Sequence, residues 1–344
     1  MATHLKHGRL KLALALLIIA AAVAVPILWQ RTLGFGERGL ALQRSEAPAV
    51  LEVERGDGFN TVLRKLRALG VTQGSDLEWK LLSRQLGVAN KLQVGDYEIP
   101  AGITPKELLR RLAAGEVIQR KFTIVEGWSV RELRAALAAQ PMLRPSTQGL
   151  DGAALMARLG RAGVHPEGRF LPETYVYTRG TDDLAILDRA ARAMDVALAE
   201  AWEGRQDGLP LDTPEQLLTL ASIVEKETGV ASERPQIAGV FVRRLRLGMR
   251  LETDPTVIYG MGESYAGNIR KTDLQTDTPY NTYQRAGLPP TPIALPGKAA
   301  LQASAHPAAG DALFFVARGN GSHHFSATYA EHLAAVRRYQ LRRR

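Results

Sequence analysis

An uncharged apolar stretch near the N-terminus sets the first limit on how this chain can fold. Leu12 to Trp29 is eighteen residues long and contains no charged residue. That length is just enough to cross the hydrocarbon core of a bilayer as a helix. Pro26 is tolerated near the end of such a helix, and Trp29 stands where an interfacial anchor is expected. We therefore predict a transmembrane helix over residues 12–30 and soluble modules in the rest of the chain.

A cleaved signal peptide would carry a similar apolar stretch. Ala22-Val23-Ala24 offers a small-x-small cleavage site. The apolar run continues past that site to Trp29, which favours a retained anchor. Two lysines and one arginine in residues 1–11 indicate a cytoplasmic N-terminus, although three arginines in residues 31–44 reduce the asymmetry.

The distribution of charge argues against a nucleic-acid partner. The chain has 44 Lys and Arg residues against 35 Asp and Glu. Eight of the cations lie in residues 1–11 and 337–344, which contain no acids, so the body of the protein is close to neutral. A nucleic-acid groove needs its excess charge on the folded surface. The terminal arginines are predicted to form a solvated tail, with contact to anionic lipid headgroups as the alternative.

Several kinds of catalysis are disfavoured by the residue types present. The chain has no cysteine, which excludes thiolate chemistry and disulfide scaffolds. Its late histidines, His306, His323 and His324, lack the HExxH pattern and the i,i+4 spacing of zinc sites. Ser222 lacks the Gly-x-Ser-x-Gly pattern of a nucleophile elbow. We predict no metal and no cofactor, which leaves carboxylic acid–base chemistry.

One predicted helix ends in two acids. Thr213 is its expected N-cap, Pro214 its first residue and Gly229 its C-cap. Apolar residues recur at helical spacing at Leu217, Leu220, Ala221 and Val224. Glu225 and Glu227 fall on opposite shoulders of that apolar face. A carboxyl group at the edge of a buried surface can stay protonated near neutral pH, as a general acid must. Solvated residues at a helix end are the alternative, and helical geometry does not choose between the two glutamates.

The first half of the soluble part repeats a strand–turn–helix unit. Gly102 to Leu108 and Gly127 to Leu133 each combine a glycine, an N-cap hydroxyl and a Glu three residues later. Each follows a strand candidate, Leu92–Ile99 or Phe122–Val125. A looser copy begins at Gly58. This pattern predicts an α+β fold.

Three long strings then resemble a known family. They are LASIVEKET-x-x-ASER from Leu220, RL-x-x-GMRL-x-TDPTVIYGMG from Arg244 and YNTY-x-x-x-GLPP-x-PI from Tyr280. Together they strongly resemble the membrane-anchored endolytic murein transglycosylases (MltG-type, YceG-like). Strings of this length are more specific than a short motif. The resemblance implies that Glu227 is the catalytic acid.

The apolar stretch, the charge pattern and the resemblance together predict the domain organisation. Residues 1–11 would be a cytoplasmic tail, 12–30 the transmembrane helix and 31–49 a linker. Residues 50–118 would form a small LysM-like βααβ glycan-binding module, and 119–335 a mixed α+β YceG-like catalytic domain. Residues 336–344 would be the basic tail.

Candidate substrate contacts lie in three loops and near the C-terminus. The candidates are Glu173, Tyr175, Asp254, Thr256, Tyr259, Tyr280, Asn281, Tyr283 and His323. Aromatic faces suit sugar rings, although most such residues are core. Asp254 could instead be a helix N-cap, and His323 could be structural. Asn281 is a candidate hydrogen-bond partner of an N-acetyl group.

One glutamate is enough for a particular kind of glycan cleavage. A glycosidase needs a second carboxylate as nucleophile or base. In a muramyl substrate the C6 hydroxyl can attack the anomeric carbon, so a single Glu can give and then take the proton. The resemblance therefore implies a lyase that cuts the MurNAc–GlcNAc β-1,4 bond of nascent strands, leaves 1,6-anhydro ends and ends strand elongation. A hydrolase remains open, because Asp254 or Glu173 could approach Glu227.

The resemblance places the protein in the bacterial inner membrane, single-pass, with its catalytic domain in the periplasm. Its partners would be peptidoglycan strands, the membrane, and peptidoglycan synthases of the division or elongation machinery. The alternative function is a non-catalytic glycan-binding scaffold of the same machinery.

Overall fold

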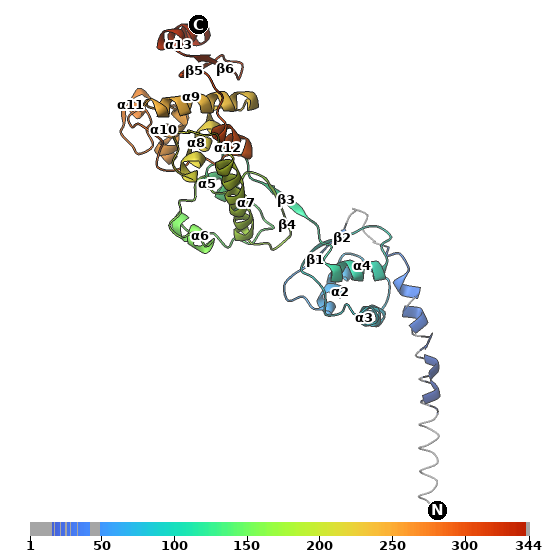
Figure 1. Ribbon diagram of the computed structural model, residues 1–344. Helices are drawn as coiled ribbons and strands as arrows, with labels where there is room; N and C mark the ends of the chain where they lie inside the picture. The colour runs from blue at the N-terminus through green and yellow to red at the C-terminus, as the bar shows by residue number, and fades with distance from the viewer. Residues whose placement is uncertain are drawn as a thin grey trace, which may run out of the picture. The chain divides into compact units, whose positions relative to one another are not determined.

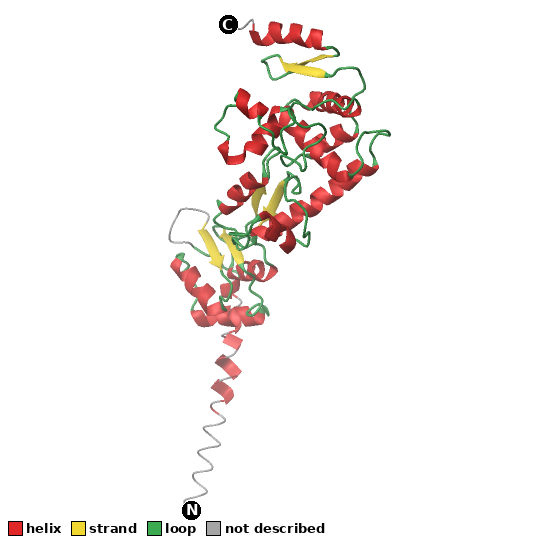
Figure 2. Cartoon of the chain, turned by 90° about the vertical axis from the view of Figure 1, so that its left-hand side faces the viewer, coloured by secondary structure: helices red, strands yellow, loops and turns green. Residues whose placement is uncertain are grey.

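The computed structural model describes residues 16–41, except 17, 21, 25, 28 and 33, and residues 49–341. The predicted tail of residues 1–11 and the arginines at 342–344 lie outside the described residues. The chain forms two compact units (Figure 1). The N-terminal unit comprises residues 1–120 with 178–180, and the C-terminal unit comprises 121–177 with 181–344. Both combine helices with short strand pairs, which confirms the α+β fold class (Figure 2).

An apolar helix precedes the folded part of the N-terminal unit. Ile18–Gly36 has a mean hydropathy of 1.5 and, among the described helices, is the one long and apolar enough to cross a membrane. It continues beyond the predicted end at residue 30. Phe35 near its end packs edge-on against Trp79 at 5.2 Å between ring centroids. Leu40 is 3% exposed, and its N–H donates to the Ile103 carbonyl. Part of the predicted linker is therefore packed, because its apolar side chains join the core.

The N-terminal unit has a strand–helix–helix–strand order, followed by one further helix. Its elements are β1 (Ala49–Val53), α2 (Phe59–Ala68), α3 (Asp76–Gln85), β2 (Gly95–Ile99) and α4 (Pro105–Ala114). β1 and β2 are antiparallel, with Ala49 opposite Ile99. Ser75 and Thr104 cap α3 and α4 through the N–H three residues later. The strand predicted over Leu92–Ile99 starts only at Gly95, because Gln93 instead bonds the carbonyl of Leu112.

The C-terminal unit is mostly helical. It contains the strand pairs β3 (Arg120–Thr123) with β4 (Thr174–Tyr177) and β5 (Phe314–Ala317) with β6 (His323–Ser326), the first residue of β3 lying at the unit boundary. Its helices are α5 (Val130–Ala138), α6 (Gly152–Arg158), α7 (Asp183–Glu203), α8 (Pro214–Glu227), α9 (Arg234–Arg246), α10 (Asp254–Met261), α11 (Lys271–Gln275), α12 (Lys298–Ala305) and α13 (Tyr329–Val336).

Helix α8 is the central element of this unit. It packs against α7, α9, α10 and α12 (Figure 1). Every residue from Leu217 to Glu225 is buried, so α8 is covered on all sides rather than on one face. Burying this run of apolar side chains stabilises the unit through the hydrophobic effect. Glu227, which follows this buried run at the end of α8, therefore extends from a tightly packed helix.

The sequence predicted the start of α8 correctly but not its end. Thr213 accepts a hydrogen bond from the Gln216 N–H and Pro214 is the first helical residue, as predicted. The predicted glycine cap is wrong. The helix ends at Glu227, and Thr228 is extended with φ −148° and ψ 136°. The Thr228 hydroxyl accepts from the Val230 N–H at 2.9 Å, so a side chain and an extended turn replace a left-handed glycine.

Candidate active site

Glu227 lies at the end of α8 and lines a pocket of about 430 Å³. Thr253, in the loop before α10, and Asp254, the first residue of α10, form one wall. The β5–β6 hairpin and α13 supply aromatic side chains on the other side, namely Phe314, Phe315, His323 and Tyr329. The rigid helix thus presents a single carboxyl group to a pocket with apolar and polar walls.

The surroundings of Glu227 favour its protonated form. Burial raises the pKa of this carboxyl from an ordinary 4.5 to about 7. A hydrogen bond that the Thr253 hydroxyl donates to Oε1 lowers the pKa, as does the nearby His323, while the charge of Asp254 raises it. Near neutral pH both the protonated and the ionised form of the group are therefore populated. It can therefore both give and take a proton.

Glu225 has a different environment and serves the fold. Its side chain is 4% exposed, and it accepts a hydrogen bond from Arg234 at 3.3 Å and one from the Gly297 N–H at 2.9 Å. Burial raises its pKa, and Arg234 and the Gly297 N–H act in the opposite direction. Both oxygens thus tie α8 to α9 and to the start of α12. The structure therefore gives the two acids different surroundings, which helical geometry alone did not predict.

His323 on β6 is fixed beside Glu227 by a second glutamate. Its ring Nδ1 lies 2.7 Å from Glu233 Oε2, and its backbone N–H donates to Glu233 Oε1 at 2.8 Å. The same imidazole meets the Phe315 ring edge-on at 5.4 Å between centroids. The β6 strand is therefore pinned to the start of α9, and the ring that lines the pocket is held in one orientation.

Asp254 and Tyr283 form a pair in the same pocket. The Tyr283 hydroxyl donates to Asp254 Oδ1 at 2.7 Å. Burial raises the pKa of Tyr283 well above its usual range, so the hydroxyl keeps the proton that it donates. Asp254 is the first residue of α10, and Thr253 is its N-cap, so the prediction of Asp254 as a possible N-cap is wrong by one residue. The Asp254 side chain therefore has no capping role, and its negative charge raises the pKa of Glu227.

Thr256 and Asn281 hold the pocket loops in place. Thr256 is fully buried, and its hydroxyl donates to the Thr253 carbonyl and pairs with Thr282. Asn281 is 1% exposed, and its amide donates to the carbonyls of three residues between 273 and 276. The interpretation of these two as substrate contacts is corrected. Their polar groups bond the backbone because the loops need internal partners.

Glu173 and Tyr175 lie away from the Glu227 pocket. The Tyr175 side chain is 7% exposed, and its hydroxyl donates to the Leu171 carbonyl at 2.8 Å. Glu173 forms an ion pair with Lys298 at 2.7 Å. It lines neither the Glu227 pocket nor the second pocket described below. The predicted contact of Tyr175 with substrate is corrected, since this ring belongs to the core. Glu173 does not approach Glu227 as a second carboxylate.

Tyr259 and Tyr280 lie on the wall of a neighbouring pocket of about 590 Å³. Sequence reasoning missed the acid behind them. Glu167 is 4% exposed, accepts from the Val130 N–H at 3.0 Å and from the Tyr259 hydroxyl at 3.2 Å. No local sequence signal marks Glu167, because its bond to Tyr259 spans 92 residues.

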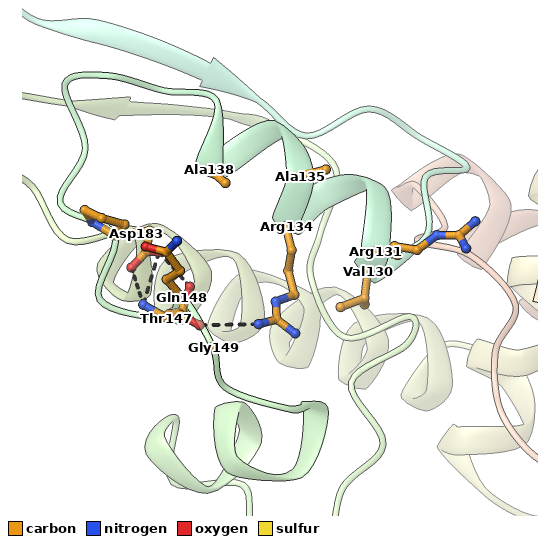
Figure 3. Close-up of a pocket in the computed structure, with 10 residues that line it drawn as sticks. Val130, Arg131, Arg134, Ala135, Ala138, Thr147, Gln148, Gly149 and Asp183 are labelled. Atoms are coloured by element: carbon orange, nitrogen blue, oxygen red, sulfur yellow. Dashed lines mark hydrogen bonds between the residues drawn. The ribbon is translucent and has the colours of Figure 1, made fainter. Parts of the chain in front are cut away.

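A further pocket of about 440 Å³ borders α5 (Figure 3). Arg134 and Asp183 both bond the loop that closes it. Arg134 donates to the Thr147 carbonyl at 3.3 Å, and Asp183 accepts from the Thr147 hydroxyl at 2.6 Å. These charged groups therefore shape a loop.

The fold and the pocket define a class of protein: a mixed α+β protein with one protonatable glutamate at the end of a buried helix. The chain belongs to the YceG-like family, whose sequence model matches residues 51–338. This confirms the resemblance noted in the sequence.

Two similar proteins are named endolytic murein transglycosylase. An endolytic murein transglycosylase of Bacillus subtilis is 30% identical over 268 residues, which are 73% of this chain and 74% of that protein. One of Streptococcus pneumoniae is 27% identical over 262 residues, 66% of this chain and 46% of that protein. The crystal structure of a YceG-like protein from Listeria monocytogenes superposes with a TM-score of 0.55 at 27% identity, covering 84% of this chain and 99% of that one.

Proposed function

We propose that this protein is an endolytic lytic transglycosylase, a lyase that cleaves the MurNAc–GlcNAc β-1,4 bond within peptidoglycan strands. The names of its relatives and its family support this reaction class. The single observation that carries the proposal is the protonatable Glu227 on the rigid end of α8, facing a pocket of about 430 Å³.

Glu227 performs both proton transfers in this mechanism. Its carboxyl group protonates the glycosidic oxygen as the bond to the anomeric carbon breaks. The carboxylate then takes the proton of the muramyl C6 hydroxyl, whose oxygen forms the new bond to the same carbon. The product is a 1,6-anhydro end, no water is consumed, and Glu227 is protonated again. A pKa of about 7 suits a group that must act in both directions.

Asp254, Tyr283 and His323 are proposed to contact the substrate around Glu227, because all three line its pocket. The negative charge of Asp254 raises the pKa of Glu227 and so favours the protonated form that the reaction needs. The second candidate function is a hydrolase in which Asp254 activates water, favoured by its place in the same pocket. The end groups of the products distinguish the two reactions.

The rate of cleavage is expected to depend on the protonation of Glu227. Because the acid form is needed for bond breaking, kcat/KM should fall above about pH 7, the pKa of this group. Thr253→Val removes a hydrogen bond that lowers this pKa, so the fall should begin at higher pH. Thr174→Val, on an exposed threonine of β4, is the matched control. A pH–rate profile of Thr253→Val that coincides with wild type, or moves to lower pH, contradicts the assignment.

We further propose that the N-terminal helix anchors the protein in the inner membrane, with both units in the periplasm. Full-length protein should then stay with membranes in carbonate, and a chain beginning at Gly34 should be soluble. Starting at Gly34 retains Phe35 and its contact with Trp79. A mature N-terminus at Val25, found by sequencing protein from cells, would instead indicate a cleaved signal.

The N-terminal unit is proposed to be a LysM-like glycan-binding module. Support comes from its βααβ order and from a groove of about 660 Å³ that includes Phe59, Asn60 and Asn90. Asn60→Ala with Asn90→Ala should weaken binding to intact sacculi. Unchanged binding would remove the groove from consideration.

We propose that the enzyme acts on nascent strands beside peptidoglycan synthases and so ends strand elongation. An anchored enzyme meets new strands at the membrane, where they are made. Longer glycan strands in cells carrying Glu227→Gln would support this role, and unchanged strand lengths would oppose it.

A further inference from the structure

The second pocket of the C-terminal unit adjoins the Glu227 pocket. Its lining includes Lys226 and Pro255, whereas Glu227 and Asp254 line the first pocket. Consecutive Cα atoms are about 3.8 Å apart, so the end of α8 and the start of α10 form a thin wall shared by the two pockets. A linear polymer held at Glu227 therefore has its next units within reach of the second pocket.

Aromatic rings and apolar side chains form much of this second pocket. Tyr259 and Tyr280 meet edge-to-face at 4.9 Å between centroids, and Tyr265, Ile258 and Ile293 complete the apolar lining. Rings in this arrangement are rigid and present faces on which the C–H surface of a sugar packs. A volume of about 590 Å³ is within the range of ligand pockets.

Tyr259 is held by a buried acid. Its hydroxyl donates to Glu167 Oε2 at 3.2 Å, while Oε1 accepts from the Val130 N–H at 3.0 Å. Burial raises the pKa of Glu167 to about 7, against the effect of these two bonds. Glu167 is therefore partly protonated near neutral pH. It positions the Tyr259 ring through their hydrogen bond and adds little negative charge to the pocket.

The charged groups at the pocket rim nearly balance. Lys226 donates to the Gly127 carbonyl at 3.2 Å, and Arg131 lies 3.7 Å from Glu263. Burial opposes the ionisation of Glu132, but bonds from Ser129 and the charge of Lys226 lower its pKa overall. The two lining cations are thus offset by Glu132 in the lining and by Glu263, which lies beside Arg131 just outside it. Such a rim favours an uncharged ligand with polar edges over an anion.

We propose that this second pocket binds an uncharged N-acetylhexosamine ring of the glycan strand, beyond the sugar pair that reacts at Glu227. The proposal rests on the proposed function and adds where the rest of the strand lies. The three tyrosines supply the stacking surface and the rim supplies hydrogen bonds to the acetamido and hydroxyl groups. The pocket makes the enzyme prefer long strands, because only these fill both sites.

Binding can be measured without cleavage in a Glu227→Gln background. Calorimetry with a peptide-free glycan of eight sugars should show about tenfold weaker binding after Tyr265→Ala, and binding close to the parent after Tyr265→Phe. Tyr265 is half-buried and lies outside the main apolar core, so its truncation leaves packing intact. Tyr339→Ala, on a half-buried tyrosine that lines neither pocket, is the matched control and should bind like the parent.

A second variant tests the same pocket independently of Tyr265. Ile258→Lys places a long cation in the pocket and should weaken the same binding. Undiminished binding by both folded variants overturns the proposal. A loss seen only with peptide-bearing strands also overturns it, since the pocket would then read the stem peptide. Neither result touches the proposed reaction, which is tested by the end groups that the active enzyme produces.

Discussion

Glu227→Gln is expected to lower the rate of glycan cleavage by about a thousandfold or more. The amide keeps the shape of the side chain and still accepts the Thr253 hydroxyl, but it has no proton to transfer. General acid–base catalysis by a positioned side chain contributes about 10²–10⁴ to the rate, and here one group acts twice. The rate should be measured on soluble glycan strands, with circular dichroism to confirm the fold.

Glu225→Gln is the matched control, two residues earlier on the same helix. Its oxygen can still accept from Arg234 or Gly297, so substantial activity should remain. If the Glu225 variant is inactive and the Glu227 variant is active, the two roles are reversed.

Arg234→Met is expected to lower the free energy of unfolding of the C-terminal unit by about 3 kcal/mol at pH 8. Arg234 and Glu225 are each 9% exposed, and removing the cation leaves a buried carboxylate without its partner. The melting temperature should fall by about 10 °C, since 1 kcal/mol corresponds to about 2–4 °C for a unit of this size.

The loss in Arg234→Met should shrink as the pH falls. Burial already raises the pKa of Glu225, and loss of the Arg234 charge raises it further, so the carboxyl becomes neutral in mild acid and no longer needs a cation. Thermal unfolding at pH 8 and pH 5.5 measures the difference. Arg192→Met, whose partner is Asp188 and whose side chain is 72% exposed, should cost less than about 1 kcal/mol. A loss for Arg234→Met that does not change with pH would contradict the assignment.

Local sequence signals predicted the framework of the site. The Thr213 cap, the Pro214 start and the capping box at Ser129 act within a few residues, so they can be read from the sequence. The candidate acid came from a resemblance, because the helix pattern could not rank Glu225 against Glu227. The structure shows how their surroundings differ: Glu225 bonds Arg234 and the Gly297 N–H, and the latter lies 72 residues further along the chain.

Tertiary contacts decided the remaining candidates. Asn281 and Tyr175 have the chemistry of sugar contacts, yet their polar groups bond nearby carbonyls and their side chains are buried. Glu167 shows the reverse case. No local pattern marks it, and its importance follows from a bond to Tyr259, 92 residues away. Residue type and spacing therefore indicate which side chains can act, and packing selects those that face a pocket.

Mass spectrometry of the products is the most direct test of the proposed reaction. Purified full-length protein, digesting peptidoglycan strands, should release fragments that end in 1,6-anhydro-MurNAc and lack one water relative to hydrolysis products. Glu227→Gln should release neither kind. Fragments with reducing MurNAc ends would contradict the lyase mechanism and assign water activation to the pocket, with Asp254 as the candidate base.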